Sequence, residues 1–112
     1  MISEAVRQRF LRDPLPVRLG NLASNLARIA SFSEHLIDRD AVASVLKESK
    51  YFCEWAAPDA PLETQAMLAE LQIQLAVWER RWRAGTPDPS MRTEAHRKSG
   101  ELLALAGLVD NA

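Results

Sequence analysis

The spacing of apolar residues between positions 15 and 36 constrains the fold more than any other feature of the chain. Apolar side chains return there at alternating steps of four and three, with one polar member: Leu15, Leu19, Leu22, Leu26, Ile29, Ser33 and Leu36. Because an α-helix turns once in about 3.6 residues, these side chains share one face of a long helix. Such a seam is stabilised by burial against other helices. The segment therefore predicts a protein built from packed helices.

Proline, glycine and aspartate mark where further helices begin and end. Proline is tolerated only in the first turn of a helix, and glycine suits the left-handed position after the last turn. Ser3, Asp38 and Asp88 are the expected N-terminal caps. The expected helices cover residues 3–12, 14–37, 38–57, 61–84 and 88–107, and Gly85 and Gly107 end the last two.

These segments predict an all-α fold: an up-and-down antiparallel four-helix bundle over residues 14–109, preceded by a short extra helix over 1–12. Connections of only a few residues oblige sequence neighbours to lie antiparallel. A chain of 112 residues has the size of a single domain with one core. We expect the short helix either to cover the bundle end near Trp55 and the 58–61 turn or to reach a second copy of the chain.

Several expected helices carry recognisable apolar faces. In the fourth, one stripe holds Leu68, Leu71, Leu75, Trp78 and Trp82, and an adjacent one holds Leu62, Ala66, Ala69, Ile73 and Ala76. A face of this breadth predicts a helix with neighbours on more than one side. The third and fifth helices offer the core Val42, Val45, Leu46, Phe52, Cys53, Ala56, and Met91, Ala95, Leu102, Leu105, Ala106, Val109.

Charge and composition exclude several classes of function. The net charge is −1, but it comes from blocks of +3 over residues 1–28, −5 over 29–70, +3 over 71–98 and −2 over 99–112. Blocks of this kind attract one another within a bundle or across a dimer, so we expect no nucleic-acid binding. The apolar stretches are far shorter than the roughly 20 residues of a membrane span. With no apolar signal segment at the amino terminus either, we expect a cytoplasmic protein that does not insert into membranes.

Side chains suited to catalysis are few. Cys53 is the one cysteine and lies on an expected core stripe, where burial makes a thiol inert. His35 and His96 would fall at the same bundle end, but the Glu-x-x-His and His-x-x-x-His spacings of metal sites do not occur. Glycine-rich phosphate loops are also lacking. We therefore expect no enzyme, no cofactor and no metal.

The tryptophans are the most distinctive candidates for a binding surface. Trp78 and Trp82 lie four residues apart on one helix face, and Trp55 stands apart from them. We favour core filling for these side chains, with a ligand pocket or a partner anchor as the alternative.

Small residues on the second helix are the other candidate. Gly20, Ala23, Ala27 and Ala30 form a strip beside the leucine seam. Small side chains let a second backbone approach closely, either in the same chain, which we favour, or in a symmetric dimer.

The run LPVRLGNLASNLARIASF over residues 15–32 and the run EWAAP over 54–58 resemble small uncharacterised helical proteins of cyanobacteria. The resemblance extends over about half of the chain, and its motifs are structural. It implies a helical fold without a known activity, and it assigns no catalytic residue.

Strong helical patterning without reactive side chains leads to a functional expectation. We expect a non-enzymatic interaction or regulatory protein that binds itself as a homodimer or binds another protein. Its interface would use Gly20, Ala23 and Ala27, the first helix, or the end near Trp78 and Trp82. The alternative is a bundle that binds a small hydrophobic molecule or pigment beside the tryptophans.

Overall fold

A computed structural model describes residues 3–35, 39–86 and 88–108, with the backbone alone at Glu34 and His35. These ranges contain helices and no strand, which confirms the all-α class. The elements are α1 (Glu4–Arg12), α2 (Leu15–His35), α3 (Arg39–Ala56), the short 3-10 helix η1 (Ala57–Asp59), α4 (Leu62–Ala84) and α5 (Pro89–Leu105).

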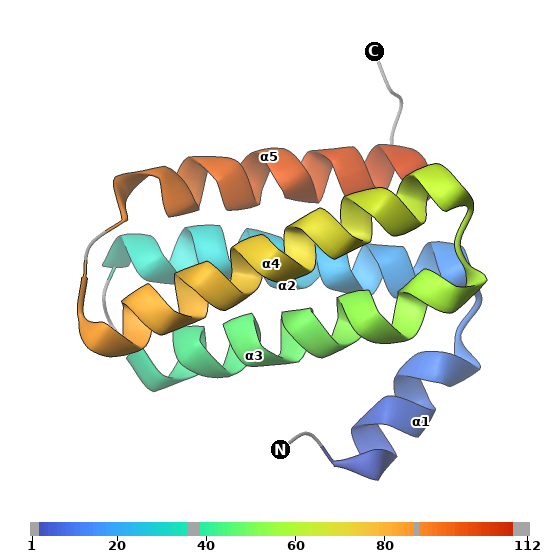
Figure 1. Cartoon of the computed structure of the whole chain (residues 1–112), viewed down its shortest axis with the longest axis horizontal. Coiled ribbons are helices and arrows are strands. Elements are labelled where there is room, and N and C mark those ends of the chain that lie inside the picture. The colour runs from blue at the N-terminus through green and yellow to red at the C-terminus, as the bar shows by residue number, and fades with distance from the viewer. Residues whose placement is uncertain (1–2, 36–38, 87, 109–112) are drawn as a thin grey trace.

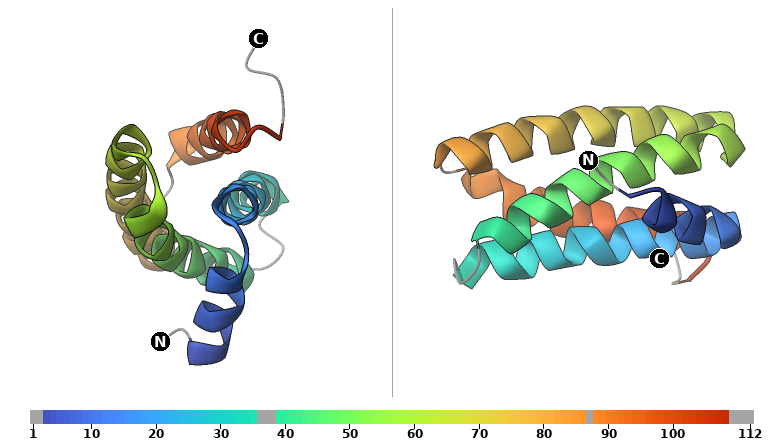
Figure 2. Two further views of the ribbon diagram at one scale, coloured as in Figure 1. Left: turned by 90° about the vertical axis from the view of Figure 1, so that its right-hand side faces the viewer. Right: turned by 90° about the horizontal axis from the view of Figure 1, so that it is seen from below.

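Helices α2 to α5 lie alongside one another, and each runs opposite to the one before it, while α1 projects from one corner (Figure 1 and Figure 2). The backbone of α2 runs close to α5 on one flank and to α3 on the other, and α3 packs in turn on α4. Among the described residues, α4 and α5 are not a closely packed pair although they are consecutive. Helix α4 is therefore covered mainly by α3 and the core, and its far side is open.

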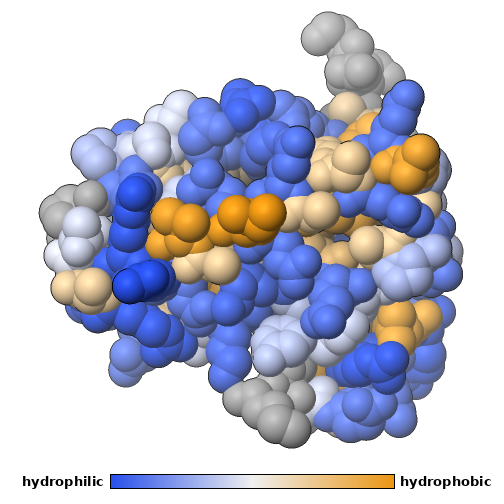
Figure 3. Space-filling view, in the orientation of Figure 1, coloured by the Kyte–Doolittle hydropathy of each residue, from blue (hydrophilic) through white to orange (hydrophobic). Residues whose placement is uncertain are grey.

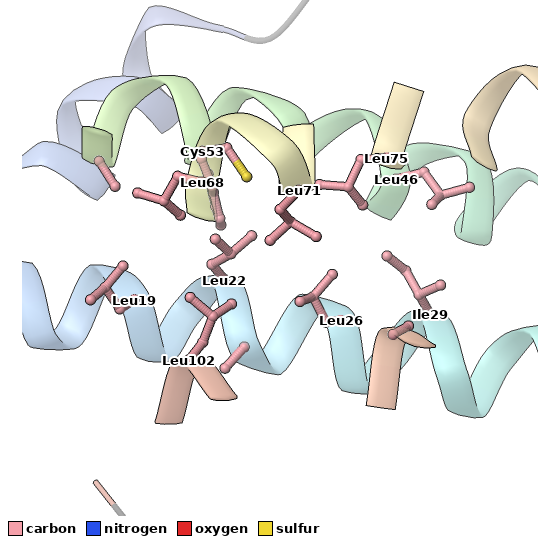
Figure 4. Packing of buried hydrophobic residues seen from close by; sticks show 14 of the residues in the cluster. Leu19, Leu22, Leu26, Ile29, Leu46, Cys53, Leu68, Leu71, Leu75 and Leu102 are labelled. Atoms are coloured by element: carbon pink, nitrogen blue, oxygen red, sulfur yellow. The ribbon is translucent and has the colours of Figure 1, made fainter. Parts of the chain in front are cut away.

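The core lies where α2, α3, α4 and α5 face one another. Leu22, Leu71 and Leu102 come from three different helices and meet near its centre (Figure 4). Burial of one such leucine contributes about 1.5–3 kcal/mol. The seam of α2 and one stripe of α4 are buried as expected, at Leu19, Leu22, Leu26 and Ile29, and at Leu68, Leu71, Leu75 and Trp78.

Most helix ends lie where the local signals predict them. The Ser3 side chain accepts a hydrogen bond from the Val6 amide, and Asp88 accepts one from the Ser90 amide. Gly85 and Gly107 have φ angles of 74° and 73°, the left-handed conformation that glycine adopts most readily. Asp38, the expected cap of α3, lies outside the described residues.

Helix α1 is attached to α3 by aromatic packing. The Phe10 ring stacks on the Phe52 ring with their centroids 4.2 Å apart, and it lies 5.8 Å from the Trp55 ring. Phe10 is the one residue of α1 that is fully buried. Of the two placements expected for the short helix, the chain adopts the one beside Trp55.

Polar side chains tie the helices together at a few buried points. The Asn25 amide donates to Glu48 Oε1 on α3 at 3.0 Å. On the other flank of α2, the Ser99 hydroxyl donates to the Ala23 carbonyl at 2.8 Å. Each bond satisfies a group that would otherwise be buried without a partner, a cost of about 1–3 kcal/mol. They add directional contacts to the nondirectional packing of the leucines.

Two expectations about the core are wrong, and a third is untested. Ala95 lies at the centre of the buried stripe of α5, and Leu105 lies about 80° around the helix from it. Leu105 is therefore 53% exposed. The second stripe of α4 has no covering helix in the described part of the chain. Helix α5, which follows α4, packs on α2 and not closely on α4. Val109 lies outside the described residues.

Candidate interaction face

Helix α4 presents a second apolar face to solvent, opposite the face that it buries. Ile73 is two residues from Leu71 and from Leu75, which places it about 200° around the helix from each. Those two leucines are at most 1% exposed, whereas Ile73 is 68% exposed. The exposed apolar residues on this side form what we call the outer α4 face: Leu62, Ala66, Ala69, Ile73, Ala76 and Val77.

The outer α4 face has the spacing of a helix–helix contact. Positions 62, 66, 69, 73 and 76 follow one another at steps of four and three residues, as in the seam of α2. In the space-filling view, apolar side chains gather along α4 between charged neighbours (Figure 3). Single exposed apolar residues are common on proteins, so it is the continuity of this stripe that makes it a candidate interaction site.

Charged side chains along α4 change sign from one end to the other. Glu63 and Glu70 lie in the first half of the helix and Arg80 lies in the second, and all three are exposed. None of the three has a hydrogen bond or ion pair within the described ranges. Arg81, by contrast, is held by Asp88 at 3.0 Å. The outer α4 face is therefore bordered by Glu63 and Glu70 toward its start and by Arg80 toward its end, three charges without a partner among the described residues.

Trp82 is part of a reciprocal link between the start of α3 and the end of α4. Its indole Nε1 donates to the Arg39 carbonyl at 2.8 Å, and Arg39 Nη2 donates to the Trp82 carbonyl at 2.7 Å. The Arg39 guanidinium also lies 5.2 Å from the centre of the indole ring, within the range of a cation–π contact. Trp82 is thus a half-buried structural side chain with one side open.

An open cavity of about 510 Å³ lies beside this link. Its volume is in the range of about 300–1,000 Å³ that small-molecule sites occupy. The lining includes Arg39, Trp78, Arg81, Trp82, Asp88 and Arg92. Hydrogen bonds from Ser90, together with the charge and hydrogen bond of Arg81, lower the pKa of the Asp88 carboxyl, so it is ionised at neutral pH. Cations therefore outnumber anions on the described wall, which suits an acidic ligand better than an uncharged pigment.

Trp78 and Trp55 occupy different settings from Trp82. Trp78 is 1% exposed and fills the core, although its indole Nε1 has no hydrogen-bond partner in the ranges that the structure gives. Trp55 is half-buried and packs against the rings of Phe10, Tyr51 and Phe52. The three tryptophans are therefore not brought together into one site.

The strip of small residues on α2 is used mainly within the chain. A side chain at Gly20 would meet the Leu108 Cδ1 atom at 2.9 Å, and Ala23 is fully buried where Ser99 of α5 bonds to its carbonyl. Ala27 is exposed and lies with His96 in a shallow hollow. The close packing of α5 leaves little of the strip open to a second molecule.

Reactive groups do not gather into a catalytic centre in the described residues. Burial raises the pKa of the Cys53 thiol to about 12, which keeps it protonated and unreactive at neutral pH. His96 is exposed, and the side chain of His35 lies outside what the structure describes. No three His, Cys, Asp or Glu side chains in the described ranges are grouped closely enough to hold a metal ion.

No described helix combines the length and apolar character needed to cross a membrane. Comparison of the chain with protein-family models, with curated proteins and with solved structures yields no match. The resemblance to cyanobacterial helical proteins therefore stays a prediction.

Sequence reasoning identified the residues of the outer α4 face except Val77, but placed them inside the fold. It missed Arg39 as the partner of Trp82, because these residues are 43 positions apart and neither carries a local signal for the other. The signal that could have identified the outer α4 face was that the two apolar stripes of the helix lie on opposite sides of it. Residues two positions apart on a helix cannot both face one core.

Proposed function

We propose that this chain is an up-and-down antiparallel four-helix bundle that serves as a non-enzymatic protein–protein interaction module, and that it binds through the outer α4 face. The observation that carries the proposal is the exposure of Ile73 in the middle of a helix whose opposite side completes the core. The core is filled by the other stripe of α4, so the fold has no need of an apolar residue at this position. Contact with another protein would remove it from water.

The binding free energy of such a contact follows from the apolar surface that it would bury. Complete burial of Leu62, Ile73 and Val77 would contribute on the order of 5 kcal/mol in total. Association costs about 4–15 kcal/mol in lost freedom of motion. The three side chains are therefore sufficient only together with apolar surface from the partner, which supports a reversible rather than a permanent complex.

Affinity capture with matched variants tests the proposal. The wild-type chain, Ile73→Asp and the control Ser24→Asp, which adds the same charge at an exposed position of α2, are immobilised and exposed to extract of the source cells. We expect the wild type and the control to retain the same specific protein, which can be the chain itself, and Ile73→Asp to lose it. Equal retention by all three, or by none, contradicts the proposal. Circular dichroism verifies that each variant is folded.

A second candidate function is supported by the cavity beside Trp82. We propose that, if the chain binds a small molecule, it takes one with an acidic group and an apolar body, because arginines and an indole line the cavity. Titration of the tryptophan fluorescence, to which Trp82 contributes, with a panel of aromatic and aliphatic carboxylates tests this. A saturable change that is lost in Arg39→Gln supports the site, and no change with any member of the panel contradicts it.

A further inference from the structure

We infer that the occupant of the outer α4 face is a second copy of this chain, packed antiparallel along α4 across a twofold axis near Ile73. The inference rests on the proposed function, and it names the partner. It is carried by two features of α4: the distribution of its unpaired charges, and the order of large and small residues along the face.

Charge complementarity fixes the direction of the pairing. An antiparallel arrangement brings Glu63 and Glu70 of one copy toward Arg80 of the other, and the twofold axis repeats the same contacts. These three charges have no partner within the described parts of one chain. A parallel arrangement would instead place acidic end beside acidic end and basic end beside basic end, which is unfavourable.

The order of side-chain sizes is self-complementary. Ile73 is near the middle of α4, with Ala69 one turn before it and Ala76 one turn after it. In an antiparallel pair, the Ile73 side chain of each copy enters the space left by Ala69 and Ala76 of the other. Alanines at these positions also allow the two helix axes to come close, which increases the buried fraction of each isoleucine.

The size of the face makes the dimer a weak one. Helix α4 has 23 residues, which corresponds to a length of about 35 Å and, at a width of about 10 Å, to a footprint of roughly 350 Å² per copy. Stable interfaces bury about 800 Å² per partner. We therefore expect exchange between monomer and dimer, with a dissociation constant in the micromolar range or above.

Thiol crosslinking between two variants that each carry one added cysteine tests the pairing. Leu62→Cys and Ala84→Cys place reactive thiols at opposite ends of the face, and buried Cys53 does not compete for the reagent. The two proteins, distinguishable by mass, are mixed at 100 µM and treated with a short bismaleimide. We expect the mixed Leu62→Cys/Ala84→Cys product to exceed either same-variant product at least tenfold. Ser24→Cys on the exposed side of α2 measures random collision.

Each other outcome overturns the inference. A dominant product between two Leu62→Cys chains means a parallel pair. Yields no higher than that of Ser24→Cys mean that the second copy is not the occupant. If the capture experiment still shows loss of a partner in Ile73→Asp, the proposed function stands with a different protein as partner. If capture fails as well, both proposals fall.

Reversal of the charge at Arg80 tests the antiparallel pairing independently of the crosslinking. Arg80→Glu makes all three unpaired charges acidic, and we expect it to weaken dimerisation about threefold to tenfold in sedimentation velocity at low salt. The double reversal Glu63→Arg with Arg80→Glu restores most of the association, because opposite signs face each other again. An unchanged dissociation constant in both variants overturns the antiparallel assignment.

Discussion

Arg18 and Asp59 form the most informative ion pair in the molecule. Arg18 Nη1 on α2 lies 2.9 Å from Asp59 Oδ2 in η1, and the Arg18 side chain is 7% exposed whereas that of Asp59 is 60% exposed. The pair connects the start of α2 with the turn between α3 and α4. Because the guanidinium is buried and the carboxylate is not, the two residues do not contribute to stability in the same way.

Removal of the carboxylate should therefore cost more than removal of the cation. Asp59→Ala leaves a buried guanidinium without its partner, and we expect a loss of about 1–2 kcal/mol in the free energy of unfolding. Arg18→Met keeps the apolar stem without the charge, and we expect a loss below about 1 kcal/mol. Urea unfolding measures both. A larger loss in Arg18→Met would mean that the pair itself is a net source of stability.

Cys53 reports on the integrity of the core. Its thiol has a pKa of about 12 in the folded chain against 9.0 without burial. Below pH 9 the thiol is neutral in both states, and between pH 9 and 12 it ionises in the unfolded chain alone. We expect the free energy of unfolding to fall with rising pH in this window, and to fall less in Cys53→Ala. Identical pH dependence in the two proteins would show that the thiol is not desolvated.

At the level of single elements, α1 depends on one side chain. Phe10 is its buried contact, and the rest of the helix is exposed or partly exposed. Nine residues are too few for a helix to be stable alone in water. The fold of α1 is therefore conditional on the stacking of Phe10 against Phe52.

Phe10→Ala should detach α1 and leave the other helices folded. We expect trypsin to cleave rapidly after Arg7, Arg9 and Arg12 in this variant, while the remainder of the chain stays resistant. The control Gln8→Ala changes an exposed residue of the same helix and should behave as the wild type. Slow cleavage of Phe10→Ala at these arginines would mean that α1 is held by other contacts.

The elements also show what the sequence can and cannot predict. Helix limits were predictable because proline, aspartate and glycine act within one turn, as at Asp88 and Gly85. The buried stripe of α4 was predictable from its spacing, but its partners were not, since periodicity defines a face without saying what covers it. The burial of Arg18 was not predicted, because a long amphipathic side chain can be buried without an apolar signal in the sequence.

At the scale of the whole molecule, the packing order determines which surface is left over. Helix α2 has neighbours on two flanks, α5 and α3, whereas α4 packs closely on α3 and not on α5 in the described residues. The small residues of α2 therefore mostly lie in the contact with α5, and the apolar residues on the far side of α4 are exposed to solvent. For this reason the candidate interface lies on α4 and not on the small residues of α2, where the sequence had suggested it.

The concentration dependence of urea unfolding tests this view of α4 most directly. If the outer α4 face joins two folded chains, the wild-type midpoint rises between 1 and 100 µM protein, because dimerisation stabilises the folded state. Ile73→Asp then unfolds at one midpoint throughout, close to that of the wild type at 1 µM. The contrary result is a wild-type midpoint that does not move, together with an Ile73→Asp midpoint lowered at every concentration by more than about 2 kcal/mol of stability, as for a core residue.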